Sequence, residues 1–267
     1  MNPMTTFPRD GDGVTSSSRS GHELRDLERE LEAEREQAAE LRALDETKNT
    51  FLAAVSHDLR TPLAAILGLA VTLQRQSLEA EQIKELAGRI ATNARKLDRM
   101  VTDLLDLDRI SHGMVAPELR PLNLGQAVAD VVGESELVAG RDLSIEVDDV
   151  VVEVDATMVE RIVENLLANA VRHTPPDSRI WIRVRSEADG EVIVVEDEGP
   201  GVPPEQRLEI FEPFRQVSAQ NDTAGVGVGL ALVARFAELQ GGRAWVEDGE
   251  HGGASFRVWL PARSRLS

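Results

Sequence analysis

Residues 51–63 read Phe-Leu-Ala-Ala-Val-Ser-His-Asp-Leu-Arg-Thr-Pro-Leu, within a longer run whose apolar residues recur every three or four positions. This spacing predicts one helix over about 22–76, because residues three and four apart share a helix face. At about 100° per residue, His57 and Thr61 point away from the apolar stripe. A histidine exposed beside Asp58 can serve as a nucleophile, or it can be an ordinary surface histidine.

A second apolar stripe runs from Ile83 to Ile110 and predicts a second long helix. Two long helices joined by a short turn cannot bury both stripes, whereas two copies of the pair can do so as a four-helix bundle. We therefore expect a homodimer. The Glu- and Arg-rich segment 22–50 has the heptad-like spacing of a coiled coil, although Glu34 falls on its seam.

Composition excludes several classes of function. The 267 residues include no cysteine and carry a net charge of −18, so disulfides and thiolate metal sites are absent and nucleic-acid binding is disfavoured. No apolar run approaches the roughly 20 residues that a membrane-spanning helix needs. The start of the chain also lacks the apolar core of a signal peptide. We expect a cytoplasmic protein without membrane insertion.

The chain is predicted to divide into three parts: a disordered tail over 1–21, a coiled-coil and dimerisation domain over 22–112, and a domain over 113–267 that begins at a Pro- and Gly-containing hinge. The last part mixes helices with a largely antiparallel sheet, which makes the fold class α+β. Its strands are predicted near 147–154, 180–185, 191–195, 243–247 and 255–260, and its helices near 124–137, 156–171 and 228–240.

One predicted helix of this domain carries polar residues in a single stripe. Asn165, Asn169 and Arg172 stand at positions i, i+4 and i+7. An amide oxygen is a suitable ligand for Mg²⁺, and a guanidinium suits phosphate oxygens. The pattern on its own equally fits the polar face of an amphipathic helix.

Two glycine-rich segments follow. The first, Asp197-Glu-Gly-Pro-Gly201, places a carboxylate at a strand end, where it could accept a hydrogen bond from an exocyclic amine such as that of adenine. The second, Gly225-Val-Gly-Val-Gly229, precedes a helix and suits phosphate binding. Between them, Phe211-Glu-Pro-Phe214 and the polar stretch 215–224 fit a nucleotide lid or a plain surface loop.

The order and spacing of these segments over about 45–262 resemble the catalytic core of the two-component sensor histidine kinases. Residues 51–63 resemble that family's phospho-acceptor box, and 165–174 its asparagine box. The remaining similar segments are two glycine boxes, a phenylalanine box and the last strand, at 197–201, 225–230, 211–214 and 256–261. The resemblance implies a helical hairpin forming a dimeric four-helix bundle, followed by a Bergerat-type α/β sandwich that binds ATP.

The resemblance also implies roles. His57 would accept the γ-phosphate, and Asp58 would orient or deprotonate the His57 ring. Thr61 would position water for dephosphorylating a partner. Asn169 would hold Mg²⁺, Asp197 would bind adenine, and the phosphoryl group would pass to an aspartate in a response-regulator receiver domain. The implied nucleotide-binding residues are Asn165, Asn169, Arg172, His173, Asp197, Gly199, Gly201, Phe211, Phe214, Gly225, Gly227, Gly229 and Leu230.

Alternatives remain at this stage. Gyrase, chaperone and mismatch-repair ATPases and some serine kinases share a Bergerat site but lack the box around His57. A non-catalytic scaffold or phosphotransfer adaptor would have eroded nucleotide boxes. Val226 stands in the second glycine box where the family often has Ser or Thr. The signal that controls the protein could come from an upstream sensor protein. We interpret three histidines as solvated: His22, His112 and His251. We interpret three tryptophans as core residues: Trp181, Trp245 and Trp259.

Overall fold

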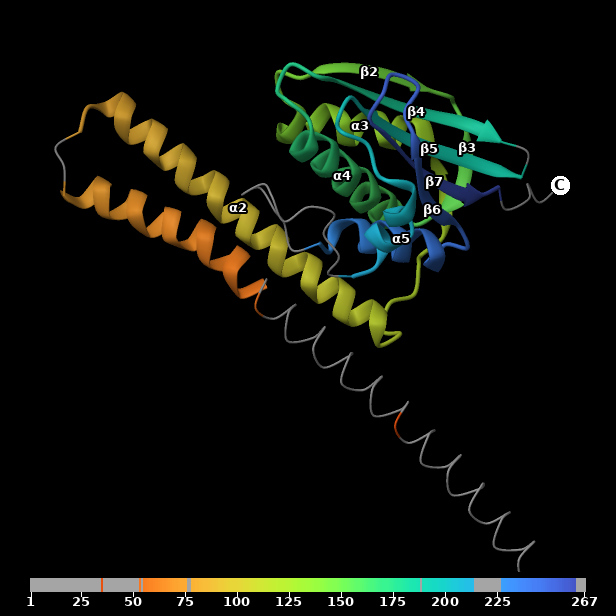
Figure 1. The fold of residues 1–267 in the computed structure, drawn as a ribbon, viewed down its shortest axis with the longest axis horizontal. Coiled ribbons are helices and arrows are strands. Elements are labelled where there is room, and N and C mark those ends of the chain that lie inside the picture. The colour runs from red at the N-terminus through yellow and green to blue at the C-terminus, as the bar shows by residue number, and fades with distance from the viewer. Residues whose placement is uncertain are drawn as a thin grey trace, which may run out of the picture. The chain divides into compact units, whose positions relative to one another are not determined.

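The computed structural model describes residues 35, 53, 55–75, 78–187, 189–213 and 227–262. Residues 55–75 are helical and form a hairpin with α2 (Ala80–Ser111), as Figure 1 shows. Both predicted helices are therefore confirmed where the chain is described. The expected tail over 1–21 lies outside the described residues, as does all of the expected coiled coil except Arg35. Within the described ranges, no helix has the length and apolar character to cross a membrane.

An α/β domain follows the hairpin, and its element order mixes helices with strands. Its elements are β1 (Arg120–Asn123), α3 (Leu124–Glu134), η1 (Glu136–Val138), β2 (Asp142–Val147), β3 (Val151–Val154), α4 (Ala156–His173), β4 (Arg179–Glu187), β5 (Gly190–Asp197), η2 (Pro204–Gln206), η3 (Glu209–Phe211), α5 (Gly229–Leu239), β6 (Arg243–Asp248) and β7 (Ala254–Pro261).

The main sheet has the strand order β2-β4-β5-β7-β6. Its β2–β4 pair is parallel and its other pairs are antiparallel, while β1 and β3 form a separate antiparallel ribbon. Helices α3, α4 and α5 lie together against the sheet (Figure 1). The predicted α+β class, with a hairpin followed by an α/β sandwich, is confirmed.

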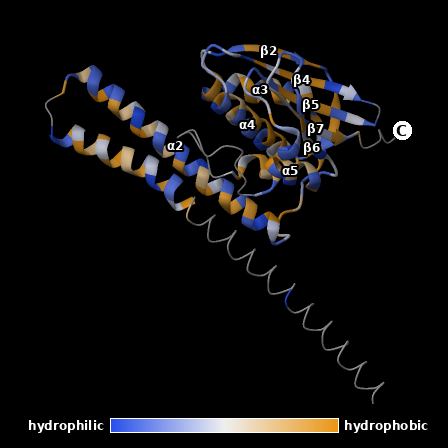
Figure 2. Cartoon of the chain, in the orientation of Figure 1, coloured by the Kyte–Doolittle hydropathy of each residue, from blue (hydrophilic) through white to orange (hydrophobic). Residues whose placement is uncertain are grey.

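The core forms where α4 and α5 pack on the sheet. Ile162, Leu166 and Leu167 of α4 are fully buried, and Figure 2 shows the sheet coloured mainly as hydrophobic. Because side chains alternate along a strand, neighbouring residues at the end of β5 point to opposite faces. Asp197 pairs in register with Ile180, and Glu196 pairs with Trp181. Asp197, the candidate for binding adenine, therefore lies on the same face as Ile180. Glu196 lies on the other face with Trp181.

Two predicted elements are wrong in detail. Of the strand expected over 147–154, Val151–Val154 forms β3 and Val147 is the last residue of β2, and these two strands belong to different sheets. Val147 pairs with Val184 of β4 in the main sheet, whereas Val151 pairs with Asn123 of β1 in the ribbon, so the chain turns between them. The helix expected over 124–137 ends at Glu134 and is followed by η1.

Candidate active site

The histidine helix (residues 55–75) presents His57 to solvent. Val55 and Pro62 are buried on the opposite side, and the His57 side chain is 78% exposed. Its Nδ1 lies 3.2 Å from Oδ1 of Asp58, a carboxylate that is only 11% exposed. In a neutral imidazole one nitrogen donates and the other accepts, so a proton on Nδ1 leaves Nε2 with a free electron pair. The predicted outward direction of His57 is confirmed.

Thr61 lies one turn beyond the histidine. Its hydroxyl donates to the His57 carbonyl at 3.2 Å, and its side chain remains exposed. This bond fixes the rotamer of Thr61 next to the imidazole, so both groups face the same solvent. The arrangement places a hydroxyl beside a candidate nucleophile, as the sequence predicts.

Helix α4 brings Asn165 against the start of α5. The Asp155 carboxylate caps α4 by accepting from the Met158 N–H at 3.1 Å. Further along, the Asn165 amide donates to the Arg161 carbonyl at 2.9 Å, which leaves its oxygen directed elsewhere. That oxygen lies so near Gly229 that a Cβ there would come within 2.8 Å of it. The asparagine box and the second glycine box, which are far apart in sequence, therefore meet.

The end of α4 carries two cationic candidates. Burial lowers the pKa of Arg172, whereas Asp58 and Asp103 of the hairpin act to raise it. Burial also lowers the pKa of His173, and the charge of Arg172 acts in the same direction. His173 is therefore predominantly neutral at pH 7, and Arg172 supplies the positive charge at this end of the helix.

Asp197 ends β5 with only 2% of its surface exposed. Its Oδ1 accepts from the Gly199 N–H at 2.7 Å and from the Ala254 N–H at 3.4 Å. Burial raises the pKa of this carboxyl, and the two N–H groups oppose that effect. Both hydrogen bonds that the described residues make to this carboxylate go to Oδ1, so Oδ2 is left to receive a ligand amine.

The first glycine box is tightly packed. A Cβ at Gly199 would lie 2.7 Å from Oδ1 of Asp197 and 2.9 Å from the His173 carbonyl, and Gly201 has a φ of +73°. Only glycine fits these positions without displacing Asp197 or α4. Gly227, with a φ of +70°, and the half-buried Phe211 and Leu230 are also described. The predicted Phe214, Gly225 and lid over 215–224 lie outside the described residues.

Comparison with known families connects these positions. Residues 47–113 match the His Kinase A (phospho-acceptor) domain, and residues 154–264 match the histidine kinase-, DNA gyrase B- and HSP90-like ATPase domain. The first match contains His57, and the second contains the asparagine and glycine boxes. The chain belongs to the two-component sensor histidine kinases. It represents their catalytic core, and its enzyme class is protein-histidine kinase.

Relatives of this histidine kinase core are larger proteins. The circadian input-output histidine kinase CikA of Synechococcus elongatus is 32% identical over 237 residues, which cover 84% of this chain and 31% of CikA. The sensor histidine kinase TmoS of Ectopseudomonas mendocina is 36% identical over 230 residues, which cover 83% of this chain and 24% of TmoS. The chain thus spans about a quarter to a third of these curated relatives.

Solved structures of histidine kinases share the fold. ThkA in complex with the response regulator TrrA matches with a TM-score of 0.59 and 26% identity, over 87% of this chain and 66% of that one. Full-length ShkA in complex with AMPPNP matches with a TM-score of 0.55 and 27% identity, over 80% of this chain and 46% of ShkA.

The sequence did not predict an ion-pair cluster between the hairpin and α4 of the kinase core. Arg161 contacts Asp103 at 2.5 Å and Asp106 at 3.1 Å, both on α2, and it also lies 3.7 Å from Glu164. Burial raises the pKa of Asp103, and Arg161 opposes that effect. Single charged residues on predicted helices carry no signal of such long-range pairing, because either helix alone would leave them in solvent.

His251 is exposed, as the sequence predicts, but it has partners that the sequence did not reveal. Its ring stacks on Trp181, with centroids 4.0 Å apart and planes inclined by 9°, and its Nδ1 lies 2.8 Å from Oε1 of Glu196. Trp181 is buried as expected, whereas Trp245 and Trp259 are half-buried beside Arg243. His112 is exposed as expected, with its Nδ1 against the Asp108 carbonyl.

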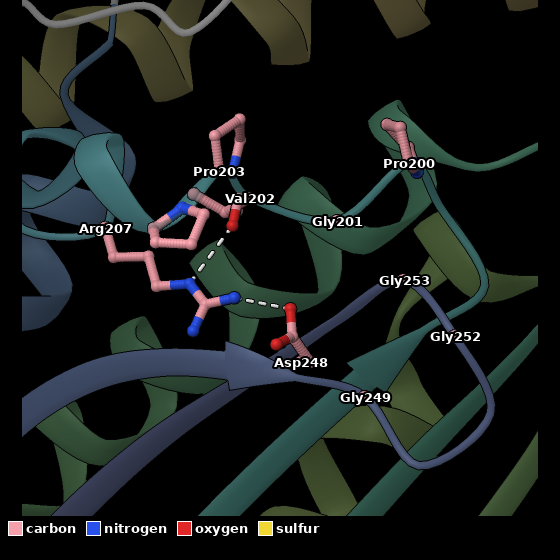
Figure 3. Close-up of a pocket in the computed structure, with 10 residues that line it drawn as sticks. Pro200, Gly201, Val202, Pro203, Arg207, Asp248, Gly249, Gly252 and Gly253 are labelled. Atoms are coloured by element: carbon pink, nitrogen blue, oxygen red, sulfur yellow. Dashed lines mark hydrogen bonds and ion pairs between the residues drawn. The ribbon is translucent and has the colours of Figure 1, made fainter.

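The β6–β7 turn (residues 249–253) packs against the first glycine box. A groove of about 470 Å³ lies between this turn and residues 200–204, and none of its lining residues belongs to α4. Figure 3 shows Arg207 spanning the groove, where its Nε donates to the Val202 carbonyl at 3.1 Å and its guanidinium pairs with Asp248. Arg207 therefore connects the residues that follow the first glycine box with the end of β6, next to the turn.

Replacing Gly253 by alanine is expected to destabilise the α/β domain by at least about 3 kcal/mol. A Cβ there would lie 2.0 Å from the Asp197 carbonyl oxygen, and the φ of +70° adds strain. Gly252→Ala is a matched control, because its φ is +84° with nothing within 4 Å, and it should cost only about 1–2 kcal/mol. Thermal unfolding followed by fluorescence of the three tryptophans measures both, and equal losses would contradict the packing argument.

Proposed function

We propose that this protein uses ATP to phosphorylate His57 and then passes the phosphoryl group to an aspartate in the receiver domain of a response regulator. The observation that carries the proposal is the exposed His57 beside the nearly buried Asp58, in a chain that also has the nucleotide boxes. ATP is abundant in the cytoplasm, and we place the reaction there.

The chemistry follows from the two side chains. With a proton on Nδ1, the free electron pair on Nε2 attacks the γ-phosphorus while the bond to the bridging oxygen breaks and ADP leaves. Asp58 stabilises the positive charge that develops on the ring and takes the Nδ1 proton. Transfer to the receiver reverses these roles: the aspartate oxygen attacks phosphorus, the N–P bond breaks, and Asp58 returns the proton.

The nucleotide is assigned to the region where α4 meets the first glycine box and the start of α5. Asp197 accepts from the adenine amine through Oδ2, and Arg172 contacts phosphate oxygens. Asn165, Gly199 and Gly201 would surround the nucleotide, with Phe211, Gly227, Gly229 and Leu230 nearer the proposed lid; the further candidates Phe214 and Gly225 lie outside the described residues.

The donor set fits Mg²⁺. Among the described residues no group of three or more His, Cys, Asp or Glu could hold a metal alone. Mg²⁺ is usually held by one or two protein oxygens together with substrate phosphates and water, and the half-buried Asn169 offers one amide oxygen. When bound there by Asn169, Mg²⁺ neutralises phosphate charge.

A homodimer accounts for apolar surface that the hairpin leaves open. Leucines and valines recur every four residues on the histidine helix, and similar residues are exposed on α2. The exposed set is Leu63, Leu67, Val71, Ile83, Val101 and Leu105. Packing against a second hairpin would bury this stripe, as in a four-helix bundle.

We also propose that the protein dephosphorylates its regulator, with Thr61 positioning the water. Replacing Thr61 by alanine is expected to leave labelling of His57 and transfer intact, but to slow loss of label from a phosphorylated receiver domain by at least about tenfold. The control is Thr72→Ala, since the Thr72 hydroxyl makes the same kind of bond to Gly68, at 2.9 Å on the same helix.

The test starts from the labelled protein, mixed with individual receiver domains from the same organism. Transfer appears as label that becomes sensitive to alkali, because an acyl phosphate replaces a phosphohistidine. If no receiver accepts label from the phosphorylated protein, the relay to a regulator is wrong. If Thr61→Ala and Thr72→Ala dephosphorylate equally, Thr61 has no part in the reaction.

A further inference from the structure

The β6–β7 turn reaches Asp197 through backbone groups. Ala254 directly follows the turn, and its N–H donates to Oδ1 of Asp197 at 3.4 Å. Gly253 lies so close to the Asp197 carbonyl that no side chain fits between them. A shift of the turn would therefore remove one of the two N–H donors that orient the carboxylate, and would change where Oδ2 points.

His251 fastens this turn to the opposite face of β5. Its backbone N–H donates to Oε1 of Glu196 at 3.0 Å, and its Nδ1 lies 2.8 Å from the same oxygen. The ring also covers Trp181 in a stacked pair. With 41% of its side chain exposed, His251 closes over a Glu196 that is only 1% exposed.

The Glu196 side chain is held in place from a second direction as well. Its second oxygen, Oε2, accepts from the Arg183 guanidinium at 3.0 Å, and Arg183 is itself buried. Burial acts to raise the pKa of the Glu196 carboxyl, but the hydrogen bonds from His251 and Arg183 outweigh it and hold the pKa below its ordinary value. The carboxylate is therefore charged at neutral pH and held from both sides.

We propose that His251 is a positioning residue for nucleotide selection: by locking the β6–β7 turn onto Glu196 and Trp181, it keeps Asp197 oriented to select purines that carry a 6-amino group. This rests on the proposed function, in which Asp197 binds adenine. Glu196 and Asp197 are adjacent and point to opposite faces of β5. A contact that holds Glu196 on one face therefore also limits the position of Asp197 on the other face.

The test compares the affinities of the full chain for ADP and for inosine diphosphate, which has an oxygen in place of the 6-amino group. Isothermal titration calorimetry measures both. His251→Phe retains an aromatic ring over Trp181 and the backbone N–H bond to Glu196, but it removes the side-chain bond from Nδ1. We expect it to weaken ADP binding by about fivefold to tenfold, the effect of one disturbed hydrogen bond, and to leave inosine diphosphate binding unchanged.

The ratio of the two affinities separates positioning from general damage, since a loosened domain would lose both ligands alike. His251→Gln, whose amide can donate to Glu196, should restore most of the preference for ADP. His112→Phe removes a histidine from the end of α2 and should behave as wild type. His251→Ser replaces the phenylalanine variant if that variant does not fold.

Two results would overturn the inference. If the variant at His251 keeps the wild-type preference for ADP, or loses both ligands equally, His251 does not position Asp197. Asp197→Asn, measured in parallel, tests the assignment of adenine to Asp197. If that change leaves the preference intact, the assignment of adenine to Asp197 fails. If it abolishes the preference while the change at His251 does not, only the role of His251 fails.

Discussion

Replacing His57 by glutamine is expected to abolish transfer of label from γ-labelled ATP to the protein, a loss of about a thousandfold or more. Glutamine matches the polarity and approximate size of histidine, but its amide nitrogen has no free electron pair with which to attack phosphorus. The nucleotide boxes are untouched, so ATP binding should persist. Purified protein is incubated with labelled ATP and Mg²⁺, and the label of the unchanged protein should survive alkali and be lost in acid.

His112 provides a matched control for this experiment. It too is an exposed histidine on a helix with an aspartate beside it, since its Nδ1 lies 3.4 Å from Oδ1 of Asp108. His112→Gln should label as wild type. Label that persists in His57→Gln would place the acceptor elsewhere. No label in either the variant or the unchanged protein, with ATP binding intact, would contradict autokinase activity under these conditions.

Replacing Asn169 by alanine is expected to reduce labelling by at least about a hundredfold, without unfolding the protein. Asn169 is half-buried on the polar stripe of α4, so its loss creates no cavity in the core. It removes the amide oxygen assigned to Mg²⁺, and with it the positioning and charge neutralisation on which phosphoryl transfer depends. Labelling at several Mg²⁺ concentrations measures the effect, which excess metal should only partly reverse.

Asn93→Ala is the control for Asn169→Ala. Asn93 is a half-buried asparagine on α2 whose amide donates to the Arg89 carbonyl at 2.8 Å, so the variant removes a comparable side chain away from the nucleotide boxes. Equal labelling by the two variants would show that Asn169 does not serve the metal. Mixing Asn169→Ala chains with His57→Gln chains extends the test, because label then arises only if transfer crosses between subunits.

Local periodicity explains why much of the fold could be predicted. The apolar stripes of the hairpin and of α4 have the helical period, so the direction of His57 and the shared face of Asn165 and Asn169 followed from spacing alone. The fold class followed as well, since helices alternate with strands after Gly113.

The errors arise where tertiary contacts decide the structure. The predicted strand joins Val147 to Val151, yet Val147 pairs with Val184 in the main sheet and Val151 pairs with Asn123 in the ribbon. His251 had no visible partner, because Glu196 lies 55 positions away and is reached only after β6 and β7 pair. Such contacts depend on sheet register, which a single sequence does not reveal.

The cluster that Arg161 forms with Asp103 and Asp106 joins α4 to α2 through charge. Charges that separate are solvated again by water, so opening the charge contact itself exposes no apolar side chain of these three residues. Dissolved ions weaken the contact, although less than they would weaken a surface pair, because the side chains of Arg161 and Asp103 are only 17% and 14% exposed. The hold of α2 on α4 is thus set partly by ionic strength, a property of the surrounding solution rather than of the fold.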